Sequence, residues 1–263
     1  MRSSESLPLA YFAACAVLCW IRPLPASRRA SITIIAVAMM LAIVSTAHYG
    51  NITIRDWAPA VSILVGYYLS GRFFIAPSAQ IERWLMSWDR RLLGDPATRF
   101  VGWPRAVLAY LEIVYMGCFL LVPAGFAVLV AAGLSMLADR YWTIVTAAEL
   151  GAFAPLVLVQ TRPPWIVERK PVLADRAVHR AASQMVQRLT IRANTFPSGH
   201  VAGSLAVGLA LADAIPWVGA VALLLAATIA LATIVGRYHY VIDAVAGACL
   251  AVTVWTLVTL AGI

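Results

Sequence analysis

The sequence predicts an all-α, polytopic membrane helix bundle. Of its 263 residues, 62% are hydrophobic and only 12% are charged, whereas a soluble domain carries about 25% charged residues. A helix needs about 20 mostly apolar residues to cross a bilayer, so long apolar segments mark candidate spans. About eight transmembrane helices are expected, at residues 7–21, 31–48, 57–76, 105–133, 141–160, 199–214, 216–235 and 241–261.

The eight spans divide into an N-terminal hairpin and a larger core. The first two spans predict a transmembrane hairpin over residues 1–56, and the last six predict a six-helix core over residues 57–263. The third span is interrupted at Gly71-Arg72, and the fourth is longer than a bilayer requires, so it begins outside the bilayer or tilts. No Pro/Gly/Ser-rich linker separates the two parts, so we predict one structural domain.

Positive charge gathers in alternate connections between the spans. The net charge is +8, and the connections after the first, third and fifth spans hold most of the arginines. The positive-inside rule would make this side cytoplasmic, but arginines that bind phosphate give the same bias, so the membrane face stays open. We expect a multi-pass protein of a bacterial inner membrane. Its partner is the lipid bilayer rather than nucleic acid, and its oligomeric state is not predicted.

Two segments outside the spans have an amphipathic pattern. Residues 79–93 predict a helix that either lies in the membrane interface or packs on the protein's own loops. Residues 172–191 predict a second helix of this kind. The apolar face of the first consists of Ile81, Trp84, Leu85, Trp88 and Leu92.

The sixth span begins directly after a Pro-Ser-Gly-His sequence. Pro197 does not fit inside a helix, and Ser198 is a favourable N-cap, so Gly199 and His200 are expected in the first helical turn. The free N–H groups and the dipole of a helix N-terminus favour an anion. The alternative is an ordinary capped helix with an interfacial histidine.

The last span begins beside a second histidine. His239 and Asp243 are four residues apart and therefore share a helical face. Asp243 is able to accept the Nδ1 proton of His239, which leaves Nε2 as a nucleophile. The alternative is an interfacial ion pair between Arg237 and Asp243. Arg162, which ends the fifth span before two prolines, lies on the same predicted side of the membrane.

These three elements, in this order and each at a span boundary, resemble the type 2 phosphatidate phosphatase superfamily of membrane lipid-phosphate phosphatases. The resemblance covers about residues 57–261 and implies a reaction without metal or other cofactor. It implies that His239 attacks phosphorus and becomes phosphohistidine, that Asp243 orients it, and that His200 protonates the leaving group. The phosphate-binding residues that it implies are Arg162, Ser198, Gly199 and Arg237.

Two departures from the family pattern leave the reaction type open. Pro155 stands where the family has a lysine, Thr233 stands where it has an arginine, and Arg237 lies only two residues before His239. These changes resemble the branch that includes inositol phosphorylceramide synthases. The reading that we favour is a lipid-phosphate phosphatase acting on monoesters or diphosphates. The alternatives are a phosphotransferase to an alcohol such as inositol, and a non-enzymatic transport or channel protein with a vestigial site.

Two acidic residues lie inside predicted spans. A carboxyl group within a bilayer is costly without a partner. Glu112 and Glu149 therefore either line a substrate cleft or form hydrogen bonds between helices, and we favour hydrogen bonds. Four candidate substrates fit the sequence equally well: phosphatidate, phosphatidylglycerol phosphate, a polyprenyl diphosphate and a sphingolipid phosphate.

Overall fold

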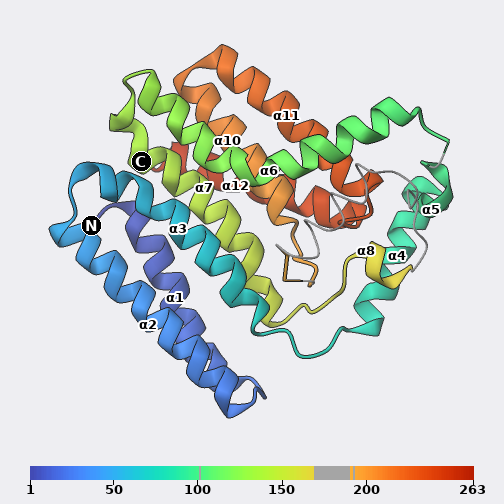
Figure 1. The fold of residues 1–263 in the computed structure, drawn as a ribbon, viewed down its shortest axis with the longest axis horizontal. Helices are drawn as coiled ribbons and strands as arrows, with labels where there is room; N and C mark the ends of the chain where they lie inside the picture. The colour runs from blue at the N-terminus through green and yellow to red at the C-terminus, as the bar shows by residue number, and fades with distance from the viewer. Residues whose placement is uncertain (101, 169–189, 192) are drawn as a thin grey trace.

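The computed structural model describes residues 1–263 except 101, 169–189 and 192. The described residues form helices and loops without a β-strand, which confirms the all-α prediction (Figure 1). The helices are α1 Ser3–Ile21, α2 Ala26–Tyr49, α3 Ile52–Gly71, α4 Ala79–Leu93, α5 Pro96–Arg99, α6 Arg105–Ala131, α7 Ala138–Phe153, α8 Pro164–Val167, α10 Gly199–Ala214, α11 Pro216–Val235 and α12 Val241–Leu260, with short 3-10 turns at Ser135–Leu137 and Ala154–Val157.

Each of the eight predicted spans corresponds to a helix. In the described part of the chain, five of them, α1, α2, α6, α11 and α12, are long and apolar enough to cross a membrane. The helix α3 has 20 residues and carries Arg55 and Asp56, whereas α7 and α10 have 16 residues each. The long apolar helices indicate a multi-pass membrane protein.

The predicted helix boundaries agree best with the structure where a proline or an N-cap residue marks them. The helix α10 begins at Gly199 and α11 begins at Pro216, as expected. The helix α7 ends at Phe153 rather than at residue 160, because Pro155 has no N–H to continue the helix. The helix α3 ends at Gly71 rather than at residue 76, at the interruption that the sequence shows.

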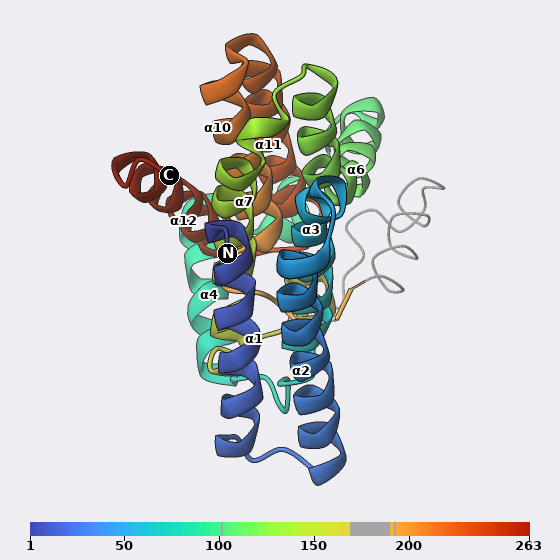
Figure 2. The same ribbon diagram turned by 90° about the vertical axis from the view of Figure 1, so that its left-hand side faces the viewer.

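The N-terminal hairpin packs against the remaining helices. Figure 2 shows α1 and α2 side by side, and α1 also contacts α3 and α7. Two ion pairs join the N-terminal end of α1 to that of α3: Arg2 to Asp56 at 2.6 Å and Arg55 to Glu5 at 2.8 Å. The division of the chain between residues 56 and 57 stays a prediction.

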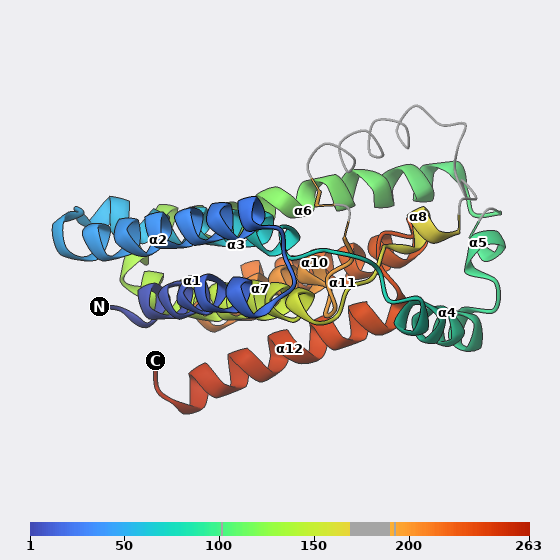
Figure 3. The ribbon, with the colours of Figure 1, turned by 90° about the horizontal axis from the view of Figure 1, so that it is seen from below.

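The helix α10 occupies the centre and contacts α6, α7, α11 and α12. At the crossing with α12, a Cβ atom on Gly247 would lie 2.6 Å from the carbonyl oxygen of Ser198. Only glycine permits this approach, so the N-termini of α10 and α12 meet. Figure 3 shows α4, α5 and α8 at the end of the molecule opposite to the two chain termini.

The predicted amphipathic helix forms as α4, but its acidic side faces the protein. Glu82, Leu85 and Asp89 are buried, whereas Trp84 and Leu92 are exposed. The second predicted amphipathic helix, residues 172–191, falls almost wholly outside the described residues.

Candidate active site

The N-termini of α10 and α12 are joined by a backbone hydrogen bond. Ser198 N donates to Asp243 O at 2.9 Å. Ser198 is the N-cap of α10, because its Oγ accepts from Val201 N at 3.4 Å, which confirms the predicted cap. The motifs that contain His200 and His239, which are 39 residues apart in sequence, are thereby held together.

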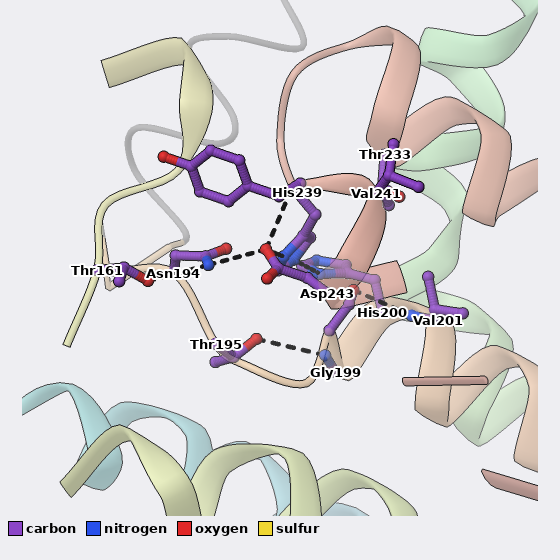
Figure 4. Close-up of polar contacts among 12 residues, drawn as sticks. Thr161, Asn194, Thr195, Gly199, His200, Val201, Thr233, His239, Val241 and Asp243 are labelled. Carbon is purple, nitrogen blue, oxygen red and sulfur yellow. Dashed lines mark hydrogen bonds and ion pairs between the residues drawn. The ribbon is translucent and has the colours of Figure 1, made fainter. Parts of the chain in front are cut away.

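The two histidines predicted to take part in chemistry lie in contact. His200 Nδ1 is 3.3 Å from His239 Nε2, and His239 Nδ1 is 3.4 Å from Asp243 Oδ2 (Figure 4). The second distance is that of an ion pair without hydrogen-bond geometry, since His239 Nδ1 makes no hydrogen bond among the described residues. His239 therefore lies between the other two groups, with its Nε2 toward His200 and its Nδ1 toward Asp243.

The carboxylate of Asp243 is fixed by two donors on its other side. Its Oδ2 accepts from Tyr240 N at 3.0 Å and from Asn194 Nδ2 at 2.8 Å. Asn194 also donates to Thr161 Oγ1 at 3.1 Å. Sequence analysis missed Asn194, whose one signal was its place at the start of the polar stretch that leads to Ser198.

The loop that carries His239 is anchored by the backbone of α11. Thr233 O accepts from Tyr238 N at 2.9 Å and from His239 N at 3.1 Å. Arg237 has a φ of 59°, a left-handed conformation that is uncommon for residues other than glycine. Trp165 N donates to Arg237 O at 3.1 Å, so tertiary contacts support this conformation. Thr233, which replaces the family's arginine, lies at the base of this loop.

Both predicted phosphate-binding arginines are paired with carboxylates. Arg237 contacts Asp89 at 2.8 Å and Glu168 at 2.6 Å. Arg162 binds Glu82 through its guanidinium and through its backbone N–H, with a closest ion-pair distance of 2.9 Å. Burial favours the neutral form of Glu82, but the hydrogen bonds from Arg162 outweigh it and lower the pKa of this carboxyl.

Sequence analysis did not assign the acidic partners of these arginines. Glu82 and Asp89 are seven residues apart, so they share one face of α4. Asp89 also accepts from Val241 N at 2.9 Å, at the first turn of α12. The acidic face of α4 thus contacts Arg162, Arg237 and the start of α12.

Aromatic rings cover the His200 side of the site. Tyr115 stacks on Tyr238 with ring centres 3.9 Å apart, and His200 lies against Tyr115 and Phe119 at 5.2 and 5.3 Å. Tyr238 donates to Glu112 at 2.7 Å, so Glu112 makes the buried hydrogen bond expected of it. Burial raises the pKa of Tyr238, so its hydroxyl keeps the donated proton.

Two cavities meet at His200. A small cavity of about 30 Å³ is bordered by His200, His239 and Trp165. A larger one of about 330 Å³ lies between α3, α6, α7 and α10 and has a mostly apolar lining. Tyr67, His200 and the loop before α10 border both cavities. A volume of this size is enough for part of a ligand.

Fold and site together define an α-helical membrane protein with a histidine pair at the meeting point of two helix N-termini. The sequence profile of the PAP2 superfamily matches residues 83–257, well over half of the chain, so the chain belongs to this superfamily. This confirms the resemblance drawn from the three motifs. The matched segment begins inside α4 and contains all the candidate site residues.

A curated relative shows a more local similarity. A PA-phosphatase related-family protein of Dictyostelium discoideum is 44% identical over 63 residues, which are 24% of this chain and 11% of that protein. The chain therefore spans only a small part of that relative. No solved structure matches the chain. Membership in the superfamily supports a phosphatase-like function in general.

Proposed function

We propose that the protein is an integral membrane lipid-phosphate phosphatase that works without a metal through a phosphohistidine at His239. The observation that carries the proposal is the 3.3 Å contact between His200 Nδ1 and His239 Nε2, with Asp243 behind His239. A nucleophile, a proton donor and an orienting carboxylate then stand in one line.

The proposed reaction has two steps. His239 Nε2 attacks phosphorus in line, the bond from phosphorus to the ester oxygen breaks, and His200 gives its proton to the departing alkoxide. Water then attacks the phosphohistidine while His200 takes a proton from it. The phosphorus–nitrogen bond breaks, and inorganic phosphate leaves with both histidines restored.

The ring contacts support one set of tautomers. Asp243 favours a proton on His239 Nδ1, because that nitrogen faces the carboxylate. His239 Nε2 then carries a lone pair, so the proton in the contact between the rings belongs to His200 Nδ1. The lone pair on His239 Nε2 is the one that attacks phosphorus. To act as the general acid, His200 must carry a proton on each ring nitrogen, so that it becomes a neutral ring when it protonates the alkoxide.

The proposed phosphate ligands are Arg162, Ser198, Gly199 and Arg237. Gly199 N donates to Thr195 Oγ1 at 3.3 Å, a length at which an anionic oxygen competes well. Arg237 Nη1 makes no hydrogen bond among the described residues and retains a donor for a phosphoryl oxygen. Arg162 is the more accessible of the two arginines, with 40% of its side chain exposed.

The proposed substrate is a lipid phosphate, a monoester or a diphosphate, taken from the bilayer. The apolar cavity of about 330 Å³ that reaches His200 supports a ligand with a hydrocarbon part. Nucleic acid is not among the proposed partners. A bacterial inner membrane and the membrane face of the site stay predictions.

The test is phosphate release by the purified full chain in detergent. We expect His239-dependent release of inorganic phosphate from a panel of lipid monophosphates and diphosphates, and acid-labile labelling of the protein by ³²P-lipid phosphate. His239→Ala should lower the rate at least about 10³-fold. The exposed His48 gives a matched control, and His48→Ala should keep the wild-type rate. Equal rates in His239→Ala and wild type would exclude the proposal.

The second candidate function is transfer of the phosphoryl headgroup to an alcohol. It is favoured by Thr233 at the place of the family's arginine. With inositol in the assay, this alternative gives a new phospholipid and little free phosphate, whereas the phosphatase needs no alcohol. A third outcome, no product with any substrate and no effect of replacing His200 and His239, would favour a non-enzymatic protein.

A further inference from the structure

The larger cavity contains an acidic group that the proposed reaction does not use. Glu149 on α7 borders the cavity together with Gly199 and His200 from α10. It is the carboxyl-bearing residue among the described residues of that lining. The opposite walls are hydrocarbon from α3 and α6, such as Leu64 and Val122.

The carboxyl of Glu149 lies directly against the backbone of α10. A Cβ atom on Gly203 would fall 1.8 Å from Glu149 Oε1, and one on Gly199 would fall 3.4 Å from Oε2. The two glycines are one helical turn apart, so together they leave a recess that the carboxyl fills. A side chain larger than hydrogen at position 203 would push Glu149 out of this place.

Glu149 makes no hydrogen bond or ion pair with another described residue, so the hydrogen bond between helices predicted for it was wrong. Glu112, in contrast, accepts a hydrogen bond from the hydroxyl of Tyr238. A carboxyl group in an apolar cavity without a hydrogen-bonding partner costs about 1–3 kcal/mol or more. Such a cost is offset when a ligand supplies the partner. The position of Glu149 beside Gly199 places that partner close to the proposed phosphate ligands.

We propose that Glu149 is a specificity residue that hydrogen-bonds an oxygen function of the lipid next to its phosphate. The inference rests on the proposed function and names its substrate class: lipid phosphates with a hydroxyl, ester or amide close to the phosphate, as in glycerol- or sphingoid-based lipids. A polyprenyl diphosphate has only hydrocarbon at this place and leaves Glu149 without a partner.

The discriminating measurement compares two substrates of equal chain length. Lysophosphatidate has a hydroxyl and an ester beside the phosphate, and hexadecyl phosphate has neither. We expect the wild type to prefer lysophosphatidate in kcat/KM by about tenfold or more, the value of one buried hydrogen bond. Glu149→Leu should remove this preference by slowing lysophosphatidate alone.

Two variants separate the hydrogen bond from packing. Glu149→Gln keeps both the shape and the ability to donate and accept, so it should retain the preference for lysophosphatidate. Gly203→Ala leaves Glu149 unchanged but occupies its recess, and the flexible carboxyl end is able to move away. It should therefore weaken the preference as Glu149→Leu does. Equal slowing of both substrates, no preference in the wild type, or loss of preference in Glu149→Gln would each overturn the inference.

A binding assay keeps this inference separate from the proposed catalysis. Non-hydrolysable phosphonate analogues of the two lipids are titrated into each variant, with tryptophan fluorescence as the signal. Tighter binding of the lysophosphatidate analogue to wild type than to Glu149→Leu supports the role of Glu149 even if no variant releases phosphate. Release of phosphate without any difference in binding or kcat/KM keeps the proposed function and excludes the role of Glu149.

Discussion

The histidine centre and the arginine cluster lie at the same end of the molecule but differ in how their polar groups are satisfied. The histidine centre is His200, His239 and Asp243, and the arginine cluster is Arg162 and Arg237 with their acidic partners. In the described part of the chain, His239 Nδ1 and Asp243 Oδ1 are buried without a hydrogen bond. Among the residues that the structure describes, the arginine cluster also has two buried atoms without a hydrogen bond, Asp89 Oδ2 and Arg237 Nη1. It differs because ion pairs join its two guanidinium groups to three carboxylates, those of Glu82, Asp89 and Glu168.

This difference suggests different roles for the two regions: the histidine centre carries out the proposed reaction, and the arginine cluster also supports the fold. A phosphoryl group is able to enter the histidine centre without separating an arginine from a carboxylate. At the arginine cluster it must share or displace a carboxylate, and the acids there oppose an anion. Buried ion pairs also hold α4 against the start of α12 through Asp89 and Arg237. We therefore expect changes at the histidine centre to lower activity alone, and changes at Arg237 to lower stability in addition to phosphate binding.

The largest expected effect is that of Asp243→Asn. The amide keeps the shape and the contacts with Tyr240 N but loses the charge that orients His239, so the rate should fall on the order of 10³-fold. The unfolding temperature in detergent should stay close to that of the wild type. Asp213→Asn, at the far end of α10, is the matched control and should keep full activity. A rate within tenfold of the wild type would contradict the orienting role of Asp243.

The second effect tests the supporting role of the arginine cluster. Arg237→Met leaves Asp89 and Glu168 without their shared cation, and breaking a buried pair in this way costs about 3–5 kcal/mol. The unfolding transition in detergent should therefore move to a clearly lower temperature.

Two further variants define the origin of that loss. The triple variant Arg237→Met, Asp89→Asn, Glu168→Gln removes the unpaired charges and should recover part of the stability. Arg90→Met, on the exposed side of α4, should unfold like the wild type. A wild-type unfolding temperature in Arg237→Met would mean that the cluster does not support the fold.

The same two regions show which parts of the site follow from local sequence. Ser198 caps the helix that begins at the next residue, as capping rules predicted. His239 and Asp243 meet as their close spacing suggested, but the predicted shared helical face was wrong, because His239 lies in the loop before α12 and only Asp243 lies in its first turn. The helices are predictable for the same reason, since apolar length and prolines act over short stretches. The early end of α7 was the exception, because Pro155 was not taken as a stop signal.

The contacts that complete the site are non-local. Asn194 reaches Asp243 across 49 residues, and Glu82 reaches Arg162 across 80. No periodicity links such positions, because they meet only when helices pack. The sequence showed that one face of α4 is charged. Whether that face contacts water or the rest of the protein depended on the positions of Arg162 and Arg237, which the sequence did not give.

The smallest expected effect is a pH dependence from Glu82. Its folded-state pKa lies below its ordinary value of 4.5, so its pair with Arg162 adds stability above about pH 4.5, and this contribution disappears as the pH falls through the lowered value. Because Arg162 is partly exposed, the contribution should be below about 1 kcal/mol. Glu82→Gln should therefore unfold slightly earlier than the wild type at pH 7 and converge with it near pH 3. Arg162→Gln breaks the same pair from the other side and should show the same convergence. Parallel curves for Glu82→Gln and wild type over this range would show that the pair adds nothing to the docking of α4.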